Sequence, residues 1–233
     1  MGHDYSDRYD PETDFDRHYT VATGTRIRRW FRPGDRVLEL GCAAGFMTSL
    51  LAERDVTVDA VERTPAYHRR AVDRGLPRAT FHLADVYEFT AGHRYEQVVA
   101  AHVLNELPDP LALLRRIREE FLAPGGLVHV SLTNPLSLHR LIALEMGLIE
   151  SVEALSERGR DFSTVRIFDA DGLEELGRQA GLTCVHREPV LLKPFTNAQL
   201  SALPDEVIAG LDRVARRFPE HGALNYAIFV AGE

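Results

Sequence analysis

Short apolar runs alternate with helix-like stretches between residues 36 and 132, and this alternation limits most strongly how the chain folds. The runs show little polar alternation, which is typical of strands buried on both faces of a sheet. Strands separated by helices form parallel sheets, because each helix returns the chain to the start of the next strand. The pattern predicts an α/β fold with strands at 36–40, 56–61, 80–84, 97–101 and 127–132, and helices at 46–53, 66–74 and 110–121.

The remainder of the chain departs from strict alternation. Segments 133–168 and 189–222 are too long for plain connections between neighbouring elements. No internal repeat or low-complexity linker divides the sequence. We therefore predict a single domain over 1–233 that carries these two segments as insertions. Its further elements are helices at 21–31 and 169–180, helical stretches at 136–149 and 205–218, and strands at 183–187 and 225–230.

Length and composition exclude several classes of protein. A chain of 233 residues buries roughly 70–75% of its surface on folding without disulfides, so we expect its two cysteines to be free thiols in a reducing compartment. The sequence shows neither a membrane-length apolar run nor a signal-like start, which predicts a cytoplasmic protein. A net charge of −8 without basic runs disfavours duplex nucleic acid. The ten histidines lack metal-ligand spacing, so we predict no metal.

The first twenty residues carry six acidic side chains with four aromatic ones spaced among them. A purely solvated tail has little use for aromatic side chains. Two interpretations remain open at this point, a frayed acidic terminus and a lid that closes over a ligand. We take residues 1–30 as an N-terminal cap or lid.

The first predicted strand ends in a turn of small residues, 41–45, that opens directly into a helix. Small residues allow backbone N–H groups to approach a ligand closely. The dinucleotide-binding fingerprint requires glycine at three positions that are Gly41, Ala43 and Phe46 here, so two of the three fail. A P-loop is excluded because no Gly-Lys-Ser/Thr follows. By itself the turn is also compatible with a purely structural strand-to-helix connection.

Two carboxylates follow the second and third predicted strands. Glu62 lies 21 residues after Gly41, close to the spacing of about 20 at which a carboxylate holds ribose hydroxyls. Asp85 is followed by Val86, and such a pair can accept a hydrogen bond from an adenine amino group and pack against its ring. The alternative for Glu62 is a solvated strand end.

Five stretches together resemble the class I S-adenosylmethionine-dependent methyltransferases, in that family's order and spacing. The resemblance implies a doubly wound, seven-stranded, mostly parallel sheet of the Rossmann-like methyltransferase type with helical insertions, and S-adenosylmethionine as cofactor. The family's usual middle glycine is Ala43 here. The stretches are VLELGCAAG (37–45), VDAVE (58–62), HLADV (82–86), VVAAHVLNELPDP (98–110) and FLAPGGLVHVSL (121–132).

The resemblance also implies which residues hold the cofactor. The glycine-containing turn and the acid before it would face the methionine end, Glu62 the ribose, and Asp85 with Val86 the adenine. The backbone near His102 would contact the amino-acid moiety. The full set is Tyr19, Glu39, Gly41, Cys42, Ala43, Gly45, Glu62, Arg63, Asp85, Val86 and His102.

The fourth predicted strand supplies the first candidates for catalysis. The family often shows Val-Leu-Glu-His after this strand, whereas this chain has His102-Val-Leu-Asn105-Glu106. His102, with an ordinary pKa near 6.5, is the first candidate general base, and Asn105 and Glu106 are candidates to orient the acceptor. A purely structural histidine at the strand end is the alternative.

A second polar group, after the fifth predicted strand, completes the candidates. We place Asn134 and Arg140 on the acceptor wall and His139 among the catalytic candidates. In the structural alternative Asn134 caps a helix, and the other two lie on a helical surface.

These features predict transfer of a methyl group from S-adenosylmethionine to an oxygen or nitrogen of a small metabolite, as in biosynthetic methylation. The acidic composition slightly favours a cationic acceptor. The alternative is a non-catalytic S-adenosylmethionine-binding partner or regulatory subunit. Neither nucleic acid nor membrane is an expected partner. The helical insertion before the last strand is a candidate lid or homodimer face.

Overall fold

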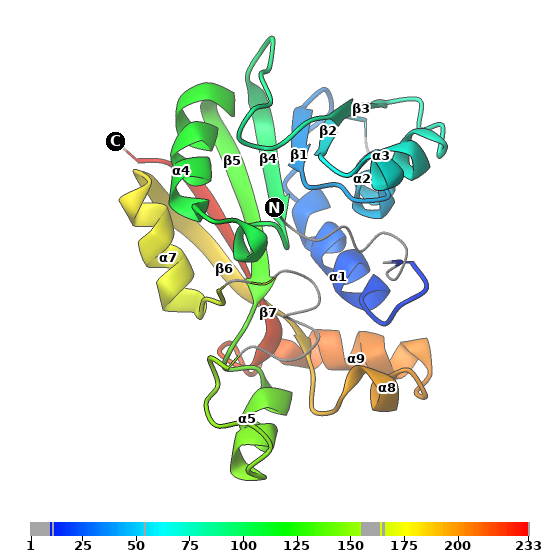
Figure 1. Ribbon diagram of the computed structural model, residues 1–233, viewed down its shortest axis with the longest axis vertical. Coiled ribbons are helices and arrows are strands. Elements are labelled where there is room, and N and C mark those ends of the chain that lie inside the picture. Colours follow the sequence, from blue (N-terminus) through cyan, green and yellow to red (C-terminus); the bar gives the residue numbers. More distant parts are fainter. Residues whose placement is uncertain (1–9, 11, 54, 155–163, 165, 233) are drawn as a thin grey trace.

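A computed structural model describes residue 10, residues 12–53 and 55–154, residue 164 and residues 166–232. In this part of the chain seven strands form one sheet in the order β3-β2-β1-β4-β5-β7-β6 (Figure 1). Only β7 is antiparallel to its neighbours, which confirms the predicted mostly parallel sheet. The strands are β1 Arg36–Leu40, β2 Thr57–Glu62, β3 Ala79–Leu83, β4 Tyr95–Ala101, β5 Leu122–Thr133, β6 Leu182–Leu192 and β7 Gly222–Ala231.

Helices connect the strands and cover both faces of the sheet. α4 continues into a π-helical turn at Ile117–Phe121, and a 3₁₀ turn at Leu104–Glu106 follows β4. The α-helices are α1 Arg17–Arg28, α2 Phe46–Leu51, α3 Pro65–Val72, α4 Pro110–Arg116, α5 Leu138–Glu145, α7 Ala170–Gln179, α8 Asn197–Leu200 and α9 Asp205–Ala215.

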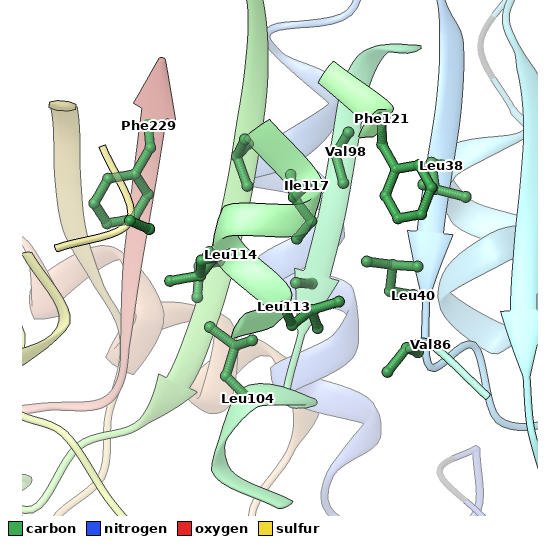
Figure 2. Packing of buried hydrophobic residues seen from close by; sticks show 14 of the residues in the cluster. Leu38, Leu40, Val86, Val98, Leu104, Leu113, Leu114, Ile117, Phe121 and Phe229 are labelled. Carbon is green, nitrogen blue, oxygen red and sulfur yellow. The ribbon is translucent and has the colours of Figure 1, made fainter. Parts of the chain in front are cut away.

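Side chains of alternating strand residues enter two separate cores. Leu38 and Leu40 of β1 pack with Leu113 and Leu114 of α4 on one face (Figure 2). Val37, which points to the other face, belongs to a second cluster that includes residues of α1, α2 and α9. Successive strand side chains point to opposite faces, so a central strand buried on both faces is mostly apolar, as the sequence pattern predicted.

The order of the strands places a topological switch between β1 and β4. From β1 the chain passes to β2 on one side, and from β4 it passes to β5 on the other. Helices on opposite faces diverge at such a point, so a crevice opens at the carboxyl ends of the two strands. The insertion helix α5 projects from the end of the sheet at which β5 finishes (Figure 1).

Two strand boundaries differ from the sequence prediction. β6 continues past Pro189 to Leu192, so the predicted insertion 189–222 begins inside a strand. A proline is accommodated because β6 is an edge strand with one paired side. β5 begins at Leu122, ahead of the predicted strand at 127–132, and its pairing with β4 shifts register between Tyr95 and Gln97.

The insertion helix predicted at 136–149 is shorter than expected. α5 ends at Glu145, and Gly147 follows with a positive φ of 68°. A glycine in the left-handed region is a common way to end a helix. The remainder of this insertion lies partly outside the described residues, which exclude 155–163 and 165.

The described part of the N-terminal segment packs onto the domain. Phe15 is 5% exposed and joins the core of the α1 face. Asp10 forms an ion pair with Arg70 at 2.5 Å, and Arg17 forms one with Asp205 at 2.7 Å. One acid and one base of this segment therefore have partners on α3 and α9, respectively. The lid predicted at 1–30 stays a prediction, because residues 1–9 and 11 lie outside the described residues.

Candidate functional site

The carboxyl ends of the parallel strands open into one cavity of about 360 Å³. Gly41 after β1, Glu62 of β2, Asp85 after β3, His102 after β4 and Thr133 of β5 all line it. Residues far apart in sequence meet here because parallel strands bring their carboxyl ends to one edge of the sheet.

Left-handed backbone conformations shape the turn after β1. Gly41 has a φ of +76°, and a Cβ at this position would lie 3.0 Å from Val103 Cγ2. Ala43 adopts a φ of +46°, at a position where the family usually has glycine. A left-handed backbone conformation costs an alanine about 1–2 kcal/mol. Cys42 lines the cavity beside them, and burial raises the pKa of its thiol. The thiol therefore stays protonated near neutral pH.

Gly45 does not line the cavity, although we predicted that it contacts the cofactor. Its N–H donates to the carbonyl of Cys42 at 2.8 Å, and its φ is +77°. A Cβ here would lie 3.2 Å from Ala71. Gly45 thus closes the turn and allows α2 to begin close to α3, behind the cavity wall.

Glu62 is held in place by the turn that it faces. Its Oε2 accepts a hydrogen bond from the N–H of Ala43 at 2.9 Å, and its Oε1 accepts one from the N–H of Thr64 at 2.6 Å. The side chain is 7% exposed and lines the cavity. A carboxylate oxygen has more than one lone-pair site, so Glu62 keeps capacity for ligand hydroxyls while its orientation is fixed.

Glu39 is a second buried carboxyl group of the cavity wall. It is 3% exposed, and its Oε2 accepts a hydrogen bond from Thr48 Oγ1 at 2.6 Å. Burial raises the pKa of Glu39 to about 7, opposed by this hydrogen bond and helped by the charge of Glu62. The carboxyl group is therefore close to half-ionised at neutral pH in the ligand-free protein.

His102 occupies an unusual backbone position at the end of β4. Its φ is +61°, and its N–H donates to the carbonyl of Ser131 at 2.8 Å. Its Nε2 is buried and has no hydrogen-bond partner in the part of the chain that the structure describes. Desolvation lowers the pKa of the imidazole, so it is neutral near pH 7.

Asn105 and Glu106 follow on the 3₁₀ turn, and both line the cavity. Asn105 is 6% exposed, and its Nδ2 donates to Thr164 Oγ1 at 3.4 Å. Its Oδ1 is buried and, like His102 Nε2, has no hydrogen-bond partner within the described residues. Two buried polar atoms on one short segment therefore lack partners.

The structure separates the predicted residues after β5. Asn134 does not line the cavity, and its Nδ2 donates to the carbonyls of Glu220 and Gly222 at 2.8 and 2.9 Å. Its amide ties the end of β5 to the start of β7, so the structure does not support the predicted acceptor contact.

His139 and Arg140 do line the cavity. His139 Nδ1 lies 3.1 Å from Ser137 Oγ, and burial, with the charges of Lys193 and Arg140, lowers the pKa of its imidazole to about 3. Arg140 donates to the carbonyl of Val152 at 2.7 Å. The guanidinium therefore anchors the segment after α5 as well as lining the wall.

The remaining predicted cofactor residues, Tyr19, Arg63, Asp85 and Val86, are cavity-lining. Asp85 Oδ1 accepts a hydrogen bond from the N–H of Tyr87 at 2.9 Å. The hydroxyl of Tyr19 lies 3.4 Å from Asn197 Oδ1, so α1 and α8 meet at the cavity rim.

Lys193 is a cavity residue that sequence reasoning missed. It is 8% exposed, and its Nζ lies 6.0 Å from the centre of the Phe15 ring and 5.8 Å from that of Tyr19. The signal was a charged residue directly after the apolar run Val190–Leu192. Because Lys193 falls within the segment predicted as the insertion 189–222, it is not among the predicted site residues.

Among the described residues, no group of three or more His, Cys, Asp or Glu side chains comes together in a way that would hold a metal ion. Over the same part of the chain, every helix is too short or too polar to cross a membrane.

Comparison with known proteins identifies the family. A family model described as "Methyltransferase domain" matches residues 15–187, which is more than half of the chain. The chain belongs to this methyltransferase family. The resemblance to the class I S-adenosylmethionine-dependent methyltransferases is confirmed, and S-adenosylmethionine is the cofactor of this family.

Two curated relatives show how far the similarity extends. The chain is 38% identical over 109 residues to a trans-aconitate 2-methyltransferase of Methylobacterium radiotolerans, which covers 45% of this chain and 41% of the relative. It is 30% identical over 175 residues to a ubiquinone biosynthesis O-methyltransferase of Cereibacter sphaeroides, with 70% and 66% covered. The chain thus spans less than two thirds of either relative.

Solved structures of this methyltransferase family's fold resemble the chain over nearly its full length. The DhpI–SAH complex has a TM-score of 0.62 at 21% identity, covering 98% of this chain and 90% of DhpI. The N-methyltransferase NodS from Bradyrhizobium japonicum, in complex with S-adenosyl-L-homocysteine, has a TM-score of 0.62 at 17% identity, with 96% and 91% covered. At these identities the likeness establishes the fold alone.

The residues of the cavity fit the cofactor. The backbone of Gly41 lines the cavity, and the absence of a side chain there lets Val103, another cavity residue, pack against the turn. Glu62 is fixed by two backbone N–H groups on the same wall. The unpartnered Nε2 of His102 is a buried polar atom that a ligand can satisfy.

Proposed function

We propose that the protein transfers a methyl group from S-adenosylmethionine to an oxygen or nitrogen atom of a small metabolite. The observation that carries this proposal is Glu62 locked against the turn after β1, at the sheet's topological switch point. This is the place and the group type that hold a ribose in open α/β sheets.

Each cofactor residue has a role that follows from its position. Glu62 would accept hydrogen bonds from the two ribose hydroxyls, Asp85 one from the adenine amino group, and Val86 would pack against the adenine ring. Glu39 and the Gly41–Ala43 turn would face the methionine end. S-adenosylmethionine supplies a methyl group that its sulfonium charge already activates.

The protein's contribution to the reaction is alignment and exclusion of water. Displacement at a sulfonium methyl group requires the acceptor in line behind the carbon, and holding it there lowers the entropic part of the barrier. His102, Asn105 and Glu106 line the wall after β4, where they would position the acceptor. A neutral His102 is available to take a proton from an acceptor that must lose one.

Calorimetry with S-adenosylhomocysteine and, separately, NAD tests cofactor choice. We expect S-adenosylhomocysteine alone to bind, and Glu62→Gln to weaken it about 10–100-fold, because hydrogen bonds to a charged group are worth about 1.5–3 kcal/mol. Glu96→Gln, in an exposed pair with Arg36, is the matched control and should leave affinity unchanged. NAD binding that weakens in Glu62→Gln would overturn the proposal.

Activity separates an enzyme from a non-catalytic S-adenosylmethionine-binding subunit. With labelled methyl groups, turnover of any small acceptor that falls on His102→Ala supports the enzyme. Tight S-adenosylhomocysteine binding without transfer to any acceptor class would favour the regulatory alternative.

A further inference from the structure

On the basis of the methyltransferase function proposed above, the side chains after β4 that line the cavity indicate which type of atom is methylated. His102 Nε2 and Asn105 Oδ1 are buried and have no hydrogen-bond partner among the described residues, and both residues line the cavity. Buried polar atoms are rarely left unsatisfied in native proteins. Two such atoms three residues apart, at the end of β4, point to a ligand that supplies what is missing.

The orientation of the Asn105 amide defines what it needs. Its Nδ2 donates to Thr164 Oγ1 at 3.4 Å, so its Oδ1 is the atom left to interact with a ligand. An amide oxygen only accepts hydrogen bonds. The ligand atom opposite it must therefore carry a hydrogen, which excludes an ionised carboxylate at this position.

His102 Nε2 needs a second ligand hydrogen as its hydrogen-bond partner. Burial lowers the pKa of the imidazole, so the ring is neutral near pH 7, and one of its nitrogens is then an acceptor. The charge of Asp16, an acid, acts in the opposite direction to burial and raises the pKa of this imidazole. By contrast, both charges that act on His139, those of Lys193 and Arg140, are positive. The His102 end of the cavity is thus the end suited to a basic group.

We propose that the methyl acceptor is a primary amine, whose two N–H groups bond to Asn105 Oδ1 and His102 Nε2. A neutral amine nitrogen offers two hydrogens and still keeps a lone pair for the methyl group. A hydroxyl group offers one hydrogen and satisfies only one of the two atoms, and a carboxylate offers none.

The reaction then balances with groups that the site holds. The amine lone pair forms a bond to the methyl carbon as the bond between that carbon and sulfur breaks, with its electron pair going to sulfur. The nitrogen becomes positively charged and releases one proton to His102 Nε2, which passes it to water. The products are the N-methyl amine and neutral S-adenosylhomocysteine.

Matched acceptors test the atom class directly. Several carbon skeletons, each supplied as primary amine, alcohol and carboxylic acid, are incubated with methyl-labelled S-adenosylmethionine. After unreacted S-adenosylmethionine has been removed by chromatography, base hydrolysis releases labelled methanol only from methyl esters. Among the labelled products, cation exchange then retains only the methylated amines. We expect label in base-stable, cation-exchange-retained products. Label only in methyl esters or ethers, or no amine methylated by a protein that binds S-adenosylhomocysteine, would overturn the inference.

Variants of Asn105 test the role of its oxygen. We expect Asn105→Leu to lower kcat/KM for the amine about 10–100-fold, the range of one lost hydrogen bond to a buried partner, with S-adenosylhomocysteine affinity unchanged. Asn105→Asp keeps an acceptor oxygen and should retain activity. Its negative charge stabilises the ammonium form of the bound substrate, so the rise of activity with pH should occur at a higher pH in this variant than in the wild type.

These readouts keep the two proposals apart. Loss of S-adenosylhomocysteine binding by the wild type would defeat the methyltransferase function itself. Equal loss of activity in Asn105→Leu and Asn105→Asp, with an unmoved pH profile, would mean that Asn105 is merely structural, and the amine inference would fail while the proposed function stood.

Discussion

At the scale of single residues, burial decides the charge state of the site. Glu39 lies at 3% exposure and its pKa is raised to about 7, whereas Glu96 is paired with Arg36 and its pKa is lowered to about 2. The two residues are the same chemical type, and both belong to the sheet. Desolvation disfavours a charge, and a cationic partner stabilises it.

This difference predicts a pH dependence for the ligand-free protein. Because the pKa of Glu39 in the folded state lies above its ordinary value of 4.5, the stability that its neutral form contributes is full below about pH 4.5 and is lost as pH rises through about 7. Glu39→Gln removes this loss. As pH rises from about 5 to about 8, the free energy of unfolding measured in urea should increase for the variant relative to the wild type by about 2–3 kcal/mol.

Glu96→Gln is the control for this experiment. Because the pKa of Glu96 is about 2, the group is ionised throughout that pH range and its contribution stays constant. Titrating histidines are common to the wild type and both variants and cancel. A stability difference for Glu39→Gln that does not change with pH would contradict the buried, neutral carboxyl group.

At the scale of elements, a buried cation joins α1 to β6 and α9. Arg26 of α1 is 1% exposed, and its Nη2 donates to Asp212 Oδ1 at 3.0 Å. Its Nε lies 2.9 Å from Glu188 Oε1. The same Asp212 oxygen accepts from the N–H of Leu191, which has a positive φ of 52°. This cluster fixes the end of β6, from which Lys193 enters the cavity.

Removal of this cation should destabilise the protein strongly. Arg26→Met leaves Asp212 and Glu188 without it, and breaking a buried ion pair costs about 3–5 kcal/mol. Arg17→Met is the matched control, because Arg17 also joins α1 to α9 but its pair with Asp205 is exposed, and such pairs contribute at most about 1 kcal/mol. If urea unfolding showed the same loss of unfolding free energy in both variants, the buried cluster would stabilise the protein no more than the exposed pair does.

At the scale of the whole molecule, one sheet separates two cores. The cluster on the α4 face and the cluster on the α1 face share the strands but no residue. In a sheet with helices on both faces, the same strand contributes side chains to both cores. Disruption of one core should therefore destabilise the other as well. The single domain predicted over 1–233 therefore implies one cooperative unfolding transition.

The lone tryptophan of the chain provides a test of this cooperativity. Trp30 precedes Phe31, which packs against the core of the α1 face, whereas Leu114 is fully buried in the other core. Leu114→Ala should cost about 2–5 kcal/mol, and the transition seen by Trp30 fluorescence should shift as much as that seen by circular dichroism. A fluorescence transition that stays in place would indicate independently unfolding parts.

Local sequence predicted the site wherever a functional residue directly follows an apolar strand. Gly41, Glu62, Asp85 and His102 all do so, and all line the cavity. Asn134 also follows a strand, yet its amide bonds to the chain before β7. Whether a strand-end side chain faces the cavity or a neighbouring segment depends on elements almost ninety residues away, as the separation of 86 between Asn134 and Glu220 shows.

The sequence by itself determined the α/β class, the helix-crossover connections, the turn after β1 and the carboxylates beside it. These features follow from local patterns of apolar residues and small turn residues, whose physical causes act within a few residues. Only the tertiary structure decided that Lys193 lies beside the rings of Phe15 and Tyr19 in the cavity, that Gly45 stays behind the cavity wall, and that His102 Nε2 and Asn105 Oδ1 have no hydrogen-bond partner among the described residues. Burial and hydrogen-bond satisfaction depend on every element that packs around a group, so they become defined only when the whole chain has folded.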